Sequence, residues 1–141
     1  MLSRKLALRL RDAGVRWHPA QGDAFVVPDR DLDDRVFVLS DMVVEVLDVP
    51  GGPPVLAFNG TTEWALDSLE AGLAVWVPRE DQLRTLLGTA FVGLQHEPGP
   101  PGFPSHVVTV VVGRERSRHV DVAAEDAYAR ALLALLAGAP G

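Results

Sequence analysis

The chain of 141 residues contains no cysteine. This absence excludes disulfide bonds, thiolate metal ligands and a cysteine nucleophile together. No apolar run approaches the roughly 20 residues that span a bilayer. The segment from Leu2 to Leu10 is interrupted by three basic residues and does not resemble a secretory signal. We therefore expect a cytoplasmic protein with no membrane partner.

Several motifs of enzymes and nucleotide-binding proteins are also missing. Neither the GxxxxGK[ST] pattern nor GxGxxG occurs, and no serine lies in a GxSxG elbow. The histidines lack a close metal-binding spacing such as HExxH; they are His18, His96, His106 and His119. A hydrolase triad is therefore unsupported, and no cofactor is predicted. A histidine site could still assemble in space, but isolated histidines are weak indications of one.

The composition is that of a folded domain with an acidic surface. Hydrophobic residues make up 48% of the chain and charged residues 23%, and the formal net charge is -6. Residues 1–70 carry 7 basic and 12 acidic side chains, and residues 71–141 carry 6 and 7. Such a surface repels phosphate backbones, so nucleic acid is not expected as a partner. The length suits a single domain with one core.

The apolar pattern predicts an α+β fold with a mostly antiparallel sheet of about six to eight strands. Helices are expected at the N-terminus, in the middle and at the C-terminus. Ser3 is placed to cap the first helix, in which Leu2, Leu6 and Leu10 recur at every fourth residue, and Gly14 is placed to end it. Four β-rich runs between Ala24 and Asn59 predict an antiparallel meander.

The rest of the chain divides at residue 88. Residues 1–88 are expected to hold the first helix, the meander and two further helices, and residues 89–141 a β-rich segment followed by the C-terminal helix. The elements after the meander are a helix from Thr61 or Thr62 to Leu69, a strand over 74–77, a helix over 78–87, a strand over 91–94, a Pro/Gly loop over 97–104, a strand over 107–112 buried on both faces, a basic turn over 114–118 and a helix over 124–137.

The strongest candidate site is a run of carboxylates in the first predicted hairpin. Asp29, Asp31, Asp33 and Asp34 lie close together in the sequence, and Asp41 follows shortly after them. Crowded carboxylates repel one another, so a nearby cation would relieve the repulsion. Hard ions such as calcium and magnesium take oxygen ligands of this kind.

This acidic turn has a simpler interpretation as a solvated hairpin. The calcium-loop template needs glycine at its sixth position and glutamate at its twelfth. Counted from Asp29, those positions hold Asp34 and Ser40, so the template fails. In the solvated hairpin the aspartates bond their own backbone, and Arg30 and Arg35 share the charge. Charge runs are more often solvated faces than ligand sites.

A second candidate is the segment from Asn59 through Thr61 and Glu63 to Trp64, which is predicted to be a turn that opens a helix. Exposed amides at a helix N-terminus can hold an anion, and Glu63 could serve as a base beside them. A plain capped turn explains the same residue types without a ligand. Tryptophans such as Trp64 are more often core residues than pocket residues.

The first 88 residues contain short motifs in a characteristic order. They are Asp12-Ala13-Gly14, Trp17, Gly22-Asp23, Val27-Pro28-Asp29-Arg30, Asp33-Asp34, Phe37-Val38, Ser40-Asp41-Met42, Phe58-Asn59-Gly60-Thr61, Glu63-Trp64-Ala65-Leu66-Asp67 and Pro78-Arg79-Glu80-Asp81-Gln82-Leu83. This order resembles a family of short, uncharacterised bacterial proteins, some of which carry a pilus-assembly label. The resemblance implies no established activity and supplies no catalytic residues.

Together these features predict a non-catalytic binding or protein-interaction module. Its surface would combine the acidic turn with the segment Asn59–Trp64, and its unidentified partner would be a basic protein. Loop residues of this kind carry function more often than core residues do.

Two other functions stay open. One is a small metal-assisted hydrolase with a carboxylate cluster, formed by Asp29, Asp31, Asp33, Asp41 and Glu63 in one pocket. The other is a structural subunit of a homo-oligomer, because the apolar C-terminal helix also carries Leu133 and Ala134 off its main face.

Overall fold

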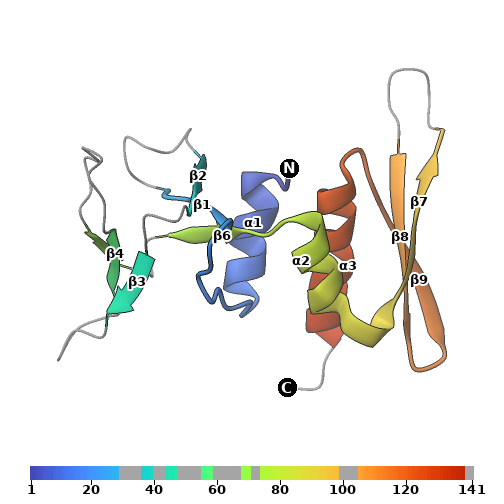
Figure 1. Ribbon diagram of the computed structural model, residues 1–141. Coiled ribbons are helices and arrows are strands. Elements are labelled where there is room, and N and C mark those ends of the chain that lie inside the picture. The colour runs from blue at the N-terminus through green and yellow to red at the C-terminus, as the bar shows by residue number, and fades with distance from the viewer. Residues whose placement is uncertain are drawn as a thin grey trace. The chain divides into compact units, whose positions relative to one another are not determined.

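A computed structural model describes residues 1–28, 36–39, 44–47, 55–58, 68–70, 74–98 and 105–138 (Figure 1). Contacts group the chain into two compact units. Unit 1 comprises Met1–Val15 and Pro78–Gly141, and unit 2 comprises Arg16–Val77. The α+β class, the antiparallel strands and the placement of the three helices are confirmed. The arrangement as a single domain stays a prediction.

The first helix of unit 1, α1, spans Arg4–Asp12. The hydroxyl of Ser3 accepts a hydrogen bond from the backbone N–H of Leu6 at 3.4 Å, which caps the helix as expected. Leu2, Leu6 and Leu10 are each no more than 3% exposed. The predicted apolar stripe is therefore a core contact. The described residues 15–17, which follow this helix, form no strand.

The other helices of unit 1 are α2 (Glu80–Leu87), a 3-10 turn η2 (Gly88–Ala90) and α3 (Ala124–Gly138). The α2 helix begins with two acidic residues that suit the positive end of its dipole. It ends at Gly88, whose φ of 59° favours glycine. The helices α1 and α2 both contact α3. None of the helices that the structure describes is long and apolar enough to cross a bilayer.

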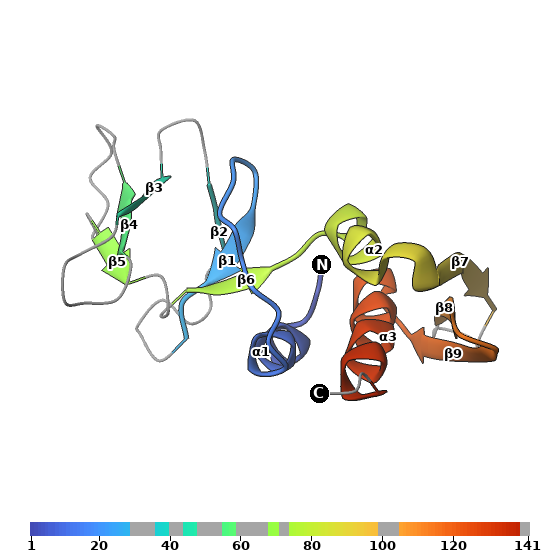
Figure 2. The ribbon, with the colours of Figure 1, turned by 90° about the horizontal axis from the view of Figure 1, so that it is seen from below.

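The sheet of unit 1 has the order β7-β8-β9 and is antiparallel. Its strands are β7 (Phe91–Glu97), β8 (Ser105–Val112) and β9 (Glu115–Asp121). The helices of unit 1 lie on one side of this sheet, where α3 contacts β8 and β9 (Figures 1 and 2). Val107 and Val108, which point to opposite faces of β8, are both fully buried, as predicted. Val112 at the end of the strand is 54% exposed, so the burial on both faces does not extend over the whole of 107–112.

The predicted basic turn over 114–118 is wrong, because the turn between β8 and β9 has only two residues. Gly113, with φ of 63°, and Arg114 form it, and Glu115 already pairs with Val112. The charges that suggested a loop lie along an exposed edge strand, where charged side chains are common. The strand predicted over 91–94 is likewise longer than expected and ends at Glu97.

Unit 2 contains a sheet with the order β2-β1-β6. Its strands are β1 (Ala24–Val26), β2 (Val36–Val38) and β6 (Val75–Val77). Buried Phe25, Val27, Leu39 and Ala74 form its core, and Phe37 stacks on Phe25 with ring centroids 5.4 Å apart. In this sheet Phe25 also lies opposite Trp76 of β6.

The second sheet of unit 2 has the order β3-β4-β5, with strands β3 (Val44–Leu47), β4 (Val55–Phe58) and β5 (Ser68–Glu70). The predicted four-stranded meander is therefore divided: β1 pairs with β2, and β3 pairs with β4, but the two pairs lie in different sheets. The helix predicted up to Leu69 is wrong at its end, because Ser68 and Leu69 pair with β4. Residues 61–67 of that helix lie outside the described residues.

We expect Leu83→Ala to lower the free energy of unfolding of the protein by about 2–5 kcal/mol, since Leu83 is fully buried on α2 and its removal leaves a cavity. Leu86 on the same helix is 39% exposed and provides a matched control, with a loss below about 1 kcal/mol for Leu86→Ala. Chemical denaturation followed by circular dichroism measures both. Equal losses would contradict the packing of α2.

Candidate functional site

The residues of the predicted binding surface lie outside the described residues. They are Asp29, Asp31, Asp33, Asp34, Asp41, Asn59, Thr61, Glu63 and Trp64. The interaction surface and the carboxylate-based hydrolase therefore stay predictions. Among the residues that the structure describes, no group of three or more His, Asp or Glu side chains could hold a metal ion.

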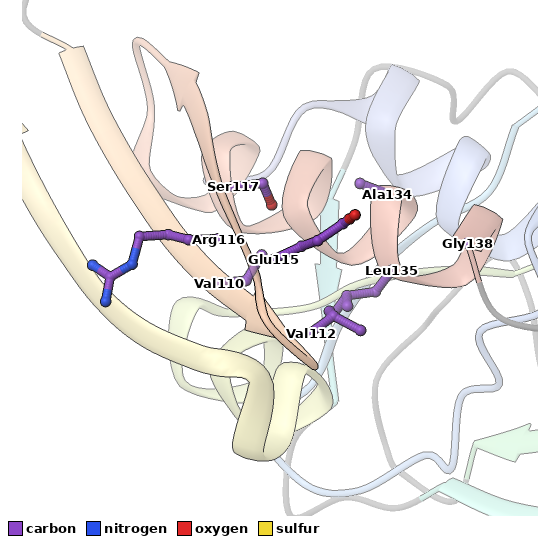
Figure 3. A pocket seen from close by; sticks show the side chains of 8 residues that line it. All are labelled: Val110, Val112, Glu115, Arg116, Ser117, Ala134, Leu135 and Gly138. Atoms are coloured by element: carbon purple, nitrogen blue, oxygen red, sulfur yellow. The ribbon is translucent and has the colours of Figure 1, made fainter.

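Unit 1 contains a groove of about 540 Å³ between the β8–β9 hairpin and the C-terminal part of α3 (Figure 3). Val110 and Val112 form its wall on the sheet, and Ala134 and Leu135 form its wall on the helix. The side chain of Glu115 points across the groove toward α3 (Figure 3). The groove thus combines apolar walls with one carboxylate that points across it.

One acidic side chain, that of Glu115, faces this groove. Glu115 is exposed and forms no ion pair with the residues that the structure describes. The last turn of α3 beside it contains no basic residue, so the negative end of the helix dipole is not offset there. Arg116 points away from the groove (Figure 3).

Ser117 lines the groove and forms a hydrogen bond with His119 on β9, with Oγ and Nε2 3.0 Å apart. Burial lowers the pKa of His119, which favours the neutral ring that a general base requires. A serine triad also needs a carboxylate on the other ring nitrogen. The nearest acid along the strand, Asp121, instead accepts hydrogen bonds from Arg130 and from the N–H of Val122. The pair is therefore not a triad.

A second polar cluster lies where α2 meets α3. The fully buried Tyr128 accepts a hydrogen bond from Arg84 at 3.1 Å and donates one to Glu80 at 3.3 Å. Phe91 stacks on Tyr128, and the guanidinium of Arg84 lies 4.6 Å from the centre of the Phe91 ring. The cluster provides hydrogen-bond partners for the buried phenol hydroxyl and connects α2, α3 and β7. Its arrangement is structural.

In unit 2, Asp23 is the buried acid among the described side chains, at 3% exposure. Its Oδ2 accepts hydrogen bonds from the indole N–H of Trp17 at 2.9 Å and from the backbone N–H of Ala20 at 3.0 Å. Trp17 also packs against the core of unit 2. These contacts give Asp23 and Trp17 a structural role in unit 2.

Comparison with protein-family profiles, with curated proteins and with solved structures finds no match for this chain. The resemblance of residues 1–88 to a family of short bacterial proteins therefore stays a prediction.

Tyr128 is the only tyrosine of the chain, so its ionisation can be followed by ultraviolet absorbance. Burial raises the pKa of its phenol, and the nearby Arg84 offsets this only in part. We expect the phenol of Tyr128 to titrate above its ordinary pKa of about 10 in the folded protein and near that value in the denatured chain. Stability should then fall as the pH rises past about 10, because the unfolded state releases its proton first. A folded phenol that titrates no later than the denatured one would contradict the cluster.

His119 should make the protein less stable in mild acid. Burial lowers the pKa of its ring, so below about 6.5, the ordinary value, the unfolded chain binds more protons than the folded one. Stability should therefore fall as the pH decreases through about 6.5 toward the lowered pKa. Urea denaturation between pH 7.5 and about 5 should show a shallower loss for His119→Gln. Ser117→Ala removes the hydrogen bond but not the burial, and should keep the original pH dependence.

Proposed function

We propose that this chain is a non-catalytic protein-interaction module that binds a basic protein through the acidic surface of unit 2. The observation that carries the proposal is how charge divides between the two units. Unit 2 contains 3 basic and 11 acidic residues, a net charge of -8, whereas unit 1 contains 10 basic and 8 acidic residues, a net charge of +2. The excess of acid is thus confined to one part of the chain.

A charge of this size in one compact unit opposes folding through self-repulsion, and a basic partner would relieve that repulsion. Six of the eleven acids in unit 2 belong to the predicted surface, and these are Asp29, Asp31, Asp33, Asp34, Asp41 and Glu63. The buried Asp23 does not contribute to this surface. Complementary charge raises association rates and disfavours partners of the same sign.

The test is charge reversal within the acidic turn. The triple variant Asp31→Lys, Asp33→Lys and Asp34→Lys should lose the proteins that the wild-type chain captures from a bacterial lysate at about 0.15 M salt, where charges act over roughly 8 Å. Captured proteins are identified by mass spectrometry, and each is then purified and titrated against both chains. Wild-type binding should weaken as the salt concentration rises.

A matched control makes the same change of net charge in unit 1. Asp12, Asp81 and Glu97 are exposed there and form surface ion pairs, which contribute little to stability. Asp81 also lies in the first turn of α2, where an acid contributes about 0.3–1 kcal/mol. Their triple replacement by lysine should keep the captured proteins. Both variants should melt within a few degrees of the wild-type chain. Equal capture by the two variants, or equal loss, would refute the acidic surface as the binding site.

A further inference from the structure

Two histidines of unit 1 lie opposite each other in the β7–β8 hairpin. His96 of β7 is the direct partner of His106 of β8, so both side chains emerge on the same face of the sheet. Their ring centroids are 5.1 Å apart, and the ring planes meet at 64°. His96 is exposed and His106 is half-buried, so a solute can reach the pair. This feature is independent of the acidic surface of unit 2.

The ring of His106 is held in one orientation by the backbone. Its Nδ1 lies 2.9 Å from the carbonyl oxygen of Val122. A carbonyl oxygen can only accept a hydrogen bond, so Nδ1 carries the proton and Nε2 keeps its lone pair. A hydrogen bond from the second nitrogen to a backbone carbonyl is the arrangement that orients and fixes the tautomer of histidines that bind metals.

The distance between the two rings matches that of two ligands on one ion. Imidazole nitrogens bind zinc at about 2.0–2.1 Å, which places the centroids of two rings on one tetrahedral ion about 5 Å apart. We propose that His96 and His106 form a two-imidazole site for a divalent late transition-metal ion. Imidazole suits copper, nickel and zinc, and copper should bind most tightly.

The carboxylates nearest in the strand register do not complete the coordination. Asp121 lies opposite His106 on β9, but its oxygens accept hydrogen bonds from Arg130 at 2.6 Å and from the N–H of Val122 at 2.7 Å. Glu97 pairs with Arg118. Residues 99–104 contain no histidine, cysteine or acid. The remaining positions on the ion are left to water or to a small ligand, and the bound ion is therefore exchangeable.

The test uses the full chain without an affinity tag, after treatment with a chelator. Calorimetric titration with copper, nickel and zinc chlorides should give saturable binding of one ion per chain. His96→Gln and His106→Gln should each weaken binding at least about tenfold, because each removes one of two ligands, and the double variant should lose it. Line broadening of both imidazole signals by copper would place the ion between these rings.

The controls are the other two histidines. His18→Gln removes an imidazole of unit 2 and should leave the titration unchanged. His119 pairs with Val108 on the same face of the sheet, but its Nε2 is hydrogen-bonded to Ser117, so His119→Gln should also leave the titration unchanged. Any binding of metal to the N-terminal amine or to carboxylates also occurs in the double variant. The heat measured with the double variant is therefore subtracted from that of the wild-type chain. The absence of saturable binding to the wild-type chain, or equal binding by the double variant, would overturn the proposal. In that case the two rings are only an aromatic contact between strands.

Discussion

The buried face of α3 is the constraint on which unit 1 depends. This helix contacts α1, α2, β8 and β9, so it joins every layer of the unit. Its inward residues Ala127 and Ala131 are small, which allows close approach, and Tyr128 fills the space toward α2. Ser3 adds a direct link, since its backbone N–H donates to Asp126 at 2.8 Å. The start of the chain is thereby fixed to its last helix.

Local patterns in the sequence were sufficient to predict the elements that have a regular or continuous apolar pattern. The leucines of α1, the start and end signals of α2 and the apolar run of β8 all predicted what the structure shows. Strand partners were not predictable in this way. The pairing of Phe25 with Trp76 joins residues far apart in the sequence, and the residues of β1 do not indicate which later strand covers its free edge. The helix predicted up to Leu69 was wrong for the same reason. The residues of β5 pair with β4, and this pairing prevails over the local helix signals.

The same difference applies to the sites. The acidic run can be read directly from the sequence, because locating charged residues requires no knowledge of how the strands pair. The division of that charge between the units becomes visible only once the chain is seen to leave unit 1 at Val15 and return to it at Pro78. The histidine pair was hidden because its ten-residue spacing matches no metal motif. Only the register of β7 against β8 places His96 beside His106.

The charges along β9 also bear on self-association. This strand is at one edge of the described sheet, where a second copy could add a strand. Antiparallel pairing of two β9 strands about Arg118 would set Arg118 against its own copy and Glu115 against Asp121. Like charges placed opposite each other destabilise a sheet. The charges of this edge therefore disfavour a dimer of unit 1 in which two β9 strands pair in this register.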